Sequence, residues 1–229
     1  MNTSINALLE WKEVSRKCRQ CGTAFTVRML SDQPDHGPQF CDSCVTAKLV
    51  TREEEERSQL LARRLLRSGI PPCYDEYNPN KDRANISDRL EAESNMLIIG
   101  PYQCGKTHAV CHAGRQLVQL AQTNVRFMRC SEWLRRVAML MGSDMEDAED
   151  EINRAKRAEL LIIDDLGKER LTERGAEILF ELIDHREVEH LPTWITANLN
   201  PAELAERLGT DRGEAIMSRM RRAYVMVTQ

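Results

Sequence analysis

The chain has 229 residues, of which 41% are hydrophobic and 30% are charged, and its formal net charge is −4. This length allows one medium-sized domain and a small appendage, and the acidic balance excludes a globally basic nucleic-acid-binding protein, so any such contact must come from local patches. The sequence has no apolar run near the ~20 residues of a membrane span and no basic-then-apolar leader, so we expect a cytoplasmic protein without membrane contact.

Four cysteines near the N-terminus have the spacing of a metal site. We expect a short helix over residues 1–14, followed by two Cys-x-x-Cys pairs made by Cys18, Cys21, Cys41 and Cys44. Together they offer four thiolates to one tetrahedral Zn²⁺, as in a zinc ribbon, and a closed set of four predicts a structural metal. A segment this short cannot bury a core, so the metal would supply its folding energy. A redox pair and burial without metal are the alternatives, and His36 is either a substitute ligand or a loop residue.

A long helix is predicted after the cysteines. Residues 47–68 carry an apolar stripe, Thr51 and Glu54 form a capping box, and Gly69 ends the helix. The Ile-Pro-Pro stretch that follows breaks regular structure. We therefore expect a zinc-binding domain over residues 1–46, a helical linker over 47–69 and a larger domain over 70–229.

Strands and helices alternate through the larger domain. The strands are expected at Asn95–Ile99, Val125–Cys130, Leu160–Asp164, Thr193–Ala197 and Tyr224–Thr228. The helices are expected at Lys106–Gln122, from Ser131, and at Asp144–Glu159, Thr172–Val188 and Pro201–Leu208. This alternation predicts an α/β fold in which helices cover a parallel sheet.

The first strand leads into a phosphate-binding motif, GPYQCGKT, at Gly100–Thr107. Glycines let the loop turn its N–H groups towards phosphate oxygens, Lys106 places a positive charge at the β- and γ-phosphates, and the Thr107 hydroxyl suits Mg²⁺. A coincidental glycine-rich turn is the alternative, which the strand–loop–helix context disfavours. The residues expected to contact ATP here are Gly100, Pro101, Tyr102, Gln103, Cys104, Gly105, Lys106, Thr107 and His108.

Polar side chains follow two later strands. Asp164 and Asp165 come at the end of a buried strand in LLIIDDLG, where an open parallel sheet collects its ligands. Asp164 is expected to hold Mg²⁺, and Asp165 to orient and polarise the attacking water. Asn198 follows the next strand, where it either hydrogen-bonds the γ-phosphate or the water, or merely turns the chain.

Two groups of arginines are candidates for binding anions. Arg219, Arg221 and Arg222 near the C-terminus either serve a phosphate, in this subunit or a neighbour's, or form a solvated basic face. Around the second strand, phosphate neutralisation on DNA is a hypothesis from charge grouping for Arg126, Arg129, Arg135 and Arg136. Trp133 among them either stacks on a base or belongs to the core.

These motifs, in this order, resemble the DnaC/DnaI/IstB group of AAA+ ATPases. The resemblance covers roughly residues 66–229 and includes SGIPP, the phosphate loop, LLIIDDLG, TANL at Thr196–Leu199 and GEAIMSRM at Gly213–Met220. It implies a five-stranded parallel sheet of order 5-1-4-3-2, nucleotide held between self-associated subunits, Asn198 at the sensor-one position and Arg219 as an arginine finger. We expect no helical lid after the last strand, and the acidic residues 144–151 depart from members that contact DNA there.

Three functions remain to be compared, two of which the resemblance implies and one of which belongs to another class. A zinc module ahead of this ATPase looks like the N-terminal region of DnaI-like loaders, which implies that the module binds a replicative hexameric helicase for delivery to single-stranded DNA. The second reading is an IstB-like helper of a transposase on duplex DNA. The third, a metabolic P-loop kinase, lacks an evident acceptor pocket and has little use for a zinc ribbon.

Overall fold

The computed structural model describes residues 11–30, 37–76, 78, 80–82, 85–168, 171–220 and 224–226. The chain divides into two compact units, Met1–Leu60 and Leu61–Gln229, and this boundary falls inside helix α1 (Asp42–Ser68). No helix in the described ranges is both long enough and apolar enough to cross a bilayer.

The first unit holds an antiparallel hairpin of β1 (Trp11–Lys17) and β2 (Ala24–Leu30). The expected helix over residues 1–14 is therefore wrong for residues 11–14, and residues 1–10 lie outside the described part. The reason is the cysteine turn: Cys18 N–H donates to Thr23 O at 2.9 Å, and Gly22, at φ 75°, donates to Cys18 O at 2.9 Å. This tight return makes the flanking residues pair as strands.

Helix α1 begins at Asp42, between the cysteines of the second pair, rather than at residue 47. Cys44 N–H and Val45 N–H both donate to Cys41 O, so the cysteine turn itself starts the helix. Thr51 consequently lies inside α1 and does not cap it; its hydroxyl donates to Ala47 O at 2.9 Å. After α1, the short turns η2 (Pro72–Tyr74) and η3 (Ser87–Arg89) lead to the sheet.

The second unit is an α/β structure with a parallel sheet, as predicted. Its strands are β3 (Met96–Ile99), β4 (Val125–Arg129), β5 (Leu160–Leu166), β6 (Thr193–Ala197) and β7 (Tyr224–Met226), in the spatial order β4-β5-β6-β3-β7. Residues 227 and 228 of the expected last strand lie outside the described part. Successive residues of the central strands are buried and point to opposite faces, so the sheet packs against one core on each side.

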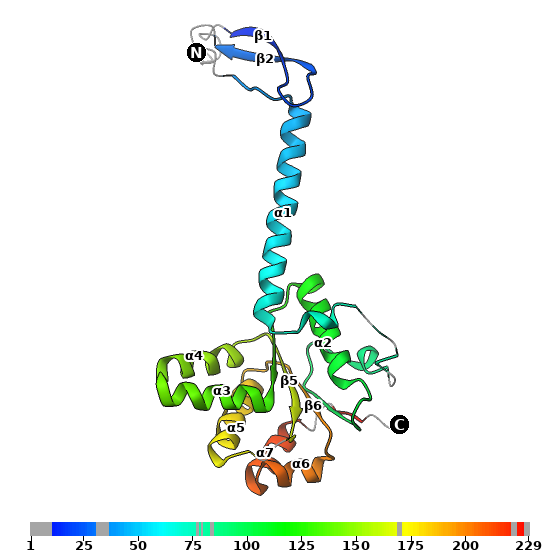
Figure 1. Ribbon diagram of the computed structural model, residues 1–229, viewed down its shortest axis with the longest axis vertical. Coiled ribbons are helices and arrows are strands. Elements are labelled where there is room, and N and C mark those ends of the chain that lie inside the picture. Colours follow the sequence, from blue (N-terminus) through cyan, green and yellow to red (C-terminus); the bar gives the residue numbers. More distant parts are fainter. Residues whose placement is uncertain are drawn as a thin grey trace, which may run out of the picture. The chain divides into compact units, whose positions relative to one another are not determined.

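Helices cover both faces of this sheet (Figure 1). Helix α2 (Lys106–Gln116), extended by the π-helical turn η4 (Leu117–Ala121), packs with Ile98, Ile162 and Trp194 in one core. The other core contains Ile99, Ile163 and Ile195 with the remaining helices. These are α3 (Cys130–Ser143), α4 (Met145–Lys156), α5 (Glu173–Val188), α6 (Pro201–Leu208) and α7 (Thr210–Arg219).

A buried arginine ties the far end of the sheet together. Arg186 of α5 is 0% exposed and donates to the carbonyl oxygens of Ala155, Ala158 and Pro192 at 3.0, 2.8 and 2.7 Å. Burial lowers the pKa of Arg186 to about 10, which leaves the side chain charged at neutral pH. Backbone carbonyls at the end of α4 and the starts of two strands therefore satisfy its donors in place of water.

Candidate nucleotide and metal sites

The phosphate loop joins β3 to α2 and has the backbone that the motif requires. Gln103 and Gly105 have positive φ values of 63° and 99°. A Cβ on Gly105 would overlap the carbonyl oxygen of Lys81, so only glycine fits between the loop and that segment. No side chain caps the start of α2, and its first N–H groups therefore remain available to an anion.

Lys106 is held at the mouth of the loop by oxygen acceptors. Its Nζ atom donates to Gly100 O, Pro101 O and Asn198 Oδ1, each at 2.8 Å, and its side chain is buried. Lys106 and Asn198, predicted from separate motifs, are thus brought together. The lysine must exchange some of these acceptors for phosphate oxygens when nucleotide enters.

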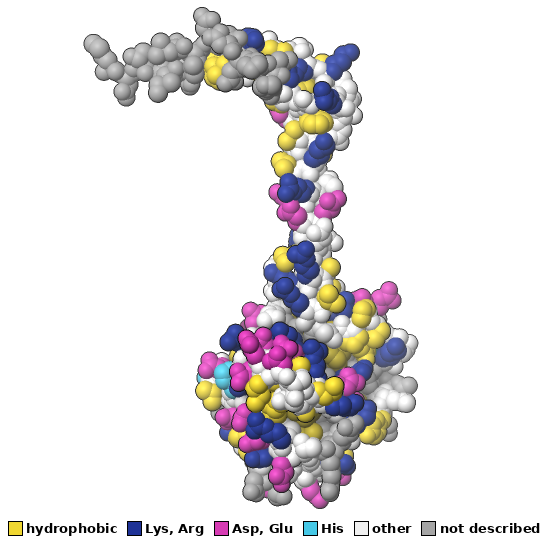
Figure 2. Space-filling model, turned by 60° about the vertical axis from the view of Figure 1, so that its left-hand side comes forward, with side chains coloured by type: hydrophobic (Ala, Val, Ile, Leu, Met, Phe, Trp, Pro, Cys, Tyr) yellow, Lys and Arg dark blue, Asp and Glu magenta, His cyan; other side chains and the backbone are white. Residues whose placement is uncertain are grey.

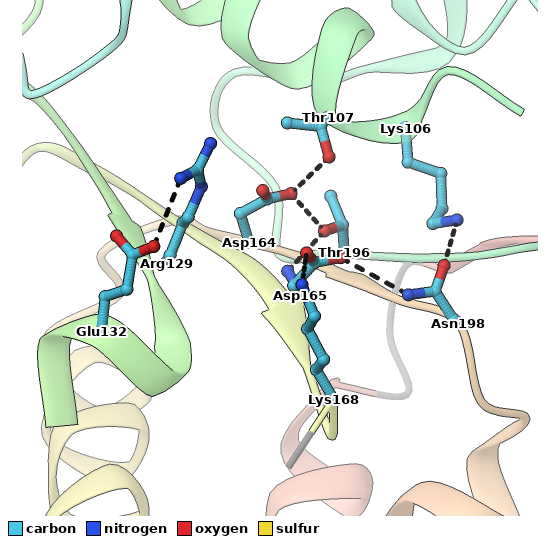
Figure 3. A network of polar contacts seen from close by, with 9 residues as sticks. All are labelled: Lys106, Thr107, Arg129, Glu132, Asp164, Asp165, Lys168, Thr196 and Asn198. Carbon is cyan, nitrogen blue, oxygen red and sulfur yellow. Dashed lines mark hydrogen bonds and ion pairs between the residues drawn. The ribbon is translucent and has the colours of Figure 1, made fainter. Parts of the chain in front are cut away.

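Asp164 lies at the centre of the polar network in Figure 3. Its Oδ1 accepts hydrogen bonds from Thr107 Oγ1 at 2.8 Å and from Thr196 Oγ1 at 2.7 Å. The carboxylate and the Thr107 hydroxyl are hard oxygen ligands at the edge of the phosphate loop, which is the donor set that suits Mg²⁺ beside phosphates.

Asp165 occupies an irregular point of β5. Its φ is 58°, and the pairing of β5 with β6 shifts register between Ile163 and Leu166. The left-handed backbone turns the Asp165 carboxylate away from Asp164, towards Asn198 Nδ2 at 3.4 Å and Lys168 Nζ at 3.6 Å (Figure 3). Two adjacent acids thereby serve different positions: one faces the loop threonine and the other faces the asparagine.

Two residues of this network were not predicted to have a role in it. Thr196, which is 0% exposed, accepts the Asp165 N–H at 3.0 Å while it donates to Asp164, so one hydroxyl orients both acids. Lys168 reaches Asp165 from the turn after β5. Thr196 could have been found from its place in the TANL stretch, at the end of a predicted strand. Nothing in the sequence distinguishes Lys168 from the other lysines.

The remaining predicted loop residues take different positions. Tyr102 is 70% exposed, whereas Cys104 is buried with its sulfur 3.6 Å from Lys106 Nζ. His108 faces the segment before the sheet, because its Nε2 accepts the Asn78 N–H at 3.1 Å. Burial lowers the pKa of His108, which favours the neutral acceptor form.

Arg219 pairs with α5 and makes none of its described contacts with this network. It forms ion pairs with Asp184 and with Glu187, the latter at 3.1 Å, and its guanidinium lies 4.9 Å from the Phe180 ring centroid. Arg221 and Arg222 lie outside the described residues.

The four N-terminal cysteines converge as predicted. The sulfur atoms of Cys18, Cys21, Cys41 and Cys44 all lie within 4.8 Å of one another. Tetrahedral zinc, with Zn–S bonds of about 2.3 Å, requires sulfur–sulfur distances of about 3.8 Å, so the cluster fits that ion. Backbone N–H groups of Cys21 and Cys41 lower the pKa of Cys18 to about 6, which favours its thiolate, whereas side-chain hydrogen bonds with Cys21 and Cys41 raise the pKa of Cys44 to about 12. His36 lies outside the described residues.

Burial raises the pKa of Asp164, and the Thr196 and Thr107 hydrogen bonds oppose that shift only in part. A raised pKa in the folded state means that this group's stability contribution is complete below its unfolded pKa and is lost as pH rises through the folded pKa. We therefore predict that Asp164→Asn is more stable than wild type at pH 7 without Mg²⁺. Urea unfolding without added Mg²⁺ should show a difference in the free energy of unfolding at pH 7 that closes at about pH 3, below the usual pKa of an aspartate.

Asp88→Asn, at an exposed position, is the control and should give no such pH-dependent gap. An Asp164→Asn variant that is less stable than wild type at pH 7 would contradict the assignment of a desolvated carboxylate.

We predict that Thr196→Val retains ATP binding but slows hydrolysis about 10- to 100-fold, the usual effect of losing an outer-shell hydrogen bond at a metal site. Valine keeps the volume of threonine but removes the bonds to both acids. Steady-state phosphate release over a Mg²⁺ titration should show a higher half-saturating concentration. Thr196→Ser, which keeps the hydroxyl, should restore the rate, and equal rates for valine and threonine would exclude this role.

Known proteins share this chain's fold and much of its sequence pattern. The ATP-binding protein of insertion sequence IS232 from Bacillus thuringiensis subsp. berliner is 28% identical over 67% of this chain and 64% of that protein, so the match spans less than two thirds of it. The replicative helicase loader DnaI of Bacillus subtilis (strain 168) is 24% identical over 92% of this chain and 74% of that protein.

A crystal structure of the DnaC helicase loader superposes with a TM-score of 0.54 and 20% identity, over 72% of this chain and 99% of that one. At this identity the likeness shows a shared fold. The model of the family described as IstB-like ATP binding protein matches residues 81–227, which include the phosphate loop, both acids, Asn198 and Arg219. With more than half of its length matched, the chain belongs to the family of IstB-like ATP binding proteins, and its second unit has the AAA+ fold.

Proposed function

We propose that this protein is a cytoplasmic, ATP-dependent loader that binds a replicative hexameric helicase and delivers it to single-stranded DNA. The observation that carries the proposal is the extent of the likeness to the helicase loader DnaI. Because that match covers 92% of this chain, it includes most of the first unit, Met1–Leu60, where the four cysteines lie. The family model, by contrast, begins at residue 81.

In this proposal, ATP hydrolysis is the switch that ends assembly. Lys106 and the N–H groups at the start of α2 bind the phosphates, and Thr107 and Asp164 hold Mg²⁺, which would neutralise charge on the phosphates. Asp165 polarises the attacking water, and Asn198, between Lys106 and Asp165, positions it. Thr196 fixes the two acids relative to each other.

The first unit acts as the helicase-binding part, with residues 1–46 as its zinc domain and the rest of α1 as a linker. Zn²⁺ bound by Cys18, Cys21, Cys41 and Cys44 stabilises this unit and has no open ligand position for catalysis. The buried residues of the cluster region are three of the cysteines, Cys18, Cys41 and Cys44, packed with Phe25 and Phe40. So small a core supports the view that metal binding supplies much of the folding free energy.

Self-association supplies the remaining group for hydrolysis. Arg219 is proposed as an arginine finger that acts on the nucleotide of a neighbouring subunit. In the single subunit Arg219 pairs with Asp184 and Glu187, whose carboxylates are both partly exposed. Because exposed ion pairs contribute little free energy, Arg219 can exchange these partners for a phosphate at small cost. This arrangement keeps an isolated subunit slow and makes hydrolysis depend on assembly.

A second candidate is an IstB-like helper ATPase of a transposase on duplex DNA. The family model and the 28% identity to the protein of insertion sequence IS232 favour it. It gives no role to the four-cysteine unit.

The two functions are separated by partner binding. We predict that the full chain with ATP and Mg²⁺ retains a purified replicative hexameric helicase in a pull-down and does not retain an IS21-type transposase. A Cys18→Ser, Cys44→Ser variant should lose the helicase but keep nucleotide binding, because it removes metal ligands from the first unit only. Cys73→Ser, at an exposed cysteine outside the cluster, should behave like wild type. Retention of the transposase alone would favour the second candidate.

We predict that Arg219→Ala binds ATP normally but hydrolyses it about 10³-fold more slowly in the assembled form, the scale of a missing arginine finger. Arg212→Ala, at an exposed position of the same helix, is the matched control. Mixing Arg219→Ala with Lys106→Ala subunits should restore part of the rate, since one supplies the nucleotide and the other the arginine. No recovery on mixing, or equal rates for Arg219→Ala and wild type, would rule out action in trans.

A further inference from the structure

Two adjoining cavities, of about 480 and 620 Å³, follow the outer edge of β4 in the second unit. Both are lined by Arg67 at the end of α1, Arg126 of β4 and Arg154 of α4, and they are called here the β4 groove. Arg129, Arg136 and Arg157 complete its set of arginines. No two of the six are adjacent in sequence: five come from α1, β4, α3 and α4, and Arg157 directly follows α4.

The groove exists because β4 is the edge strand of the sheet. In the described part of the chain β4 pairs only with β5, and the segment after α1 crosses its free edge. Gly69, at φ 73°, makes this crossing close: a Cβ there would lie 3.0 Å from Phe127 O. The walls are then the end of α1 on one side and the α3–α4 pair on the other.

The groove has an excess of positive charge. Its six arginines face three carboxylates, those of Glu132, Asp150 and Glu151. Glu151, with a side chain only 4% exposed, pairs with Arg126, with Arg154 at 3.7 Å and with Arg136 at 4.0 Å. Arg67 and Arg157 form no ion pair with any described carboxylate. Figure 2 shows basic side chains beside the base of α1, next to an acidic cluster.

The lining indicates a polyanion rather than a protein partner. Protein interfaces have an apolar centre, but Phe127, Met128 and Trp133, the large apolar residues of the lining, are each at most 9% exposed. The accessible walls are mainly guanidinium groups, which bind phosphates with planar pairs of donors. The buried Trp133 Nε1 also has no hydrogen-bond acceptor in the described part of the protein.

We infer that the β4 groove binds the phosphate backbone of single-stranded DNA. A positively charged groove that follows one backbone is the arrangement typical of proteins that bind single strands. This inference rests on the proposed loader function and assigns its DNA to one surface. One end of the groove adjoins the nucleotide site, because Arg129 is in register with Asp164 across β4 and β5 (Figure 3).

The test compares neighbouring arginines of the same helix. Arg136 lines the groove and Arg135 does not, although both are exposed residues of α3. Binding of the full chain, with ATP and Mg²⁺, to a fluorescent oligo(dT) strand is measured by anisotropy across a salt series. For single strands the slope of log affinity against log salt falls by about 0.7 for each phosphate that the protein no longer neutralises.

We predict that Arg136→Gln and Arg157→Gln each weaken binding severalfold and reduce this slope by about 0.7, and that the double variant shows about twice that reduction. Arg135→Gln should match wild type in both quantities. Equal effects of Arg135→Gln and Arg136→Gln, or tighter binding of a duplex of the same length, would overturn the assignment to single strands in this groove.

Two further outcomes separate this inference from the proposed function. If wild type binds oligo(dT) and the groove variants bind it equally, the groove is not the DNA site although the loader function stands. If the variants keep DNA affinity but lose self-association in sedimentation experiments, the groove receives a second copy of the chain and the inference is wrong. Absence of oligo(dT) binding by wild type would overturn both.

Discussion

One carboxylate oxygen connects the parts of the nucleotide site. Asp164 Oδ1 accepts hydrogen bonds from the hydroxyl groups of Thr107, at the start of α2, and of Thr196, on β6. Because Asp164 itself lies on β5, these bonds join the phosphate-loop helix to two strands. The position is costly for a charge, because burial raises the pKa of Asp164. The domain therefore keeps an anion poorly solvated at the place where the proposed Mg²⁺ and phosphates would bind. A cation bound there would offset the free-energy cost of the buried carboxylate charge, so the occupied site would be favoured over the empty one.

The same network suggests how binding and hydrolysis are kept apart. Lys106 contacts two loop carbonyls and Asn198, and Asn198 contacts Asp165, so the groups for phosphate binding and for water activation share one asparagine. When Lys106 turns to a phosphate, the Asn198 side-chain oxygen is released from its donor and the amide can reorient. In the proposed mechanism nucleotide binding thus prepares the water site, and Arg219 remains with α5 until a neighbour is present.

Buried charge recurs in the second unit with different partners. Arg186 is satisfied by backbone carbonyls and holds the starts of β5 and β6, whereas Glu151 is satisfied by three arginines at the edge of β4. The first arrangement directs its donors to backbone oxygens and has a structural role. The second has more arginines than carboxylates, so it keeps positive charge that an anionic ligand can neutralise.

The sequence was sufficient to predict the family, the parallel α/β fold, the phosphate loop, the acid pair and the four-cysteine cluster, because each depends on local spacing or on strand periodicity. It misjudged the β1 hairpin and the start of α1, where the cysteine turn overrides local helix signals. Three features became visible once the chain was folded: Thr196 hydrogen-bonds both acids, Arg219 pairs with α5, and Arg67, Arg136 and Arg157 share a groove. These contacts join residues far apart in the chain, and such pairings are set by how strands and helices pack rather than by any pattern along the sequence.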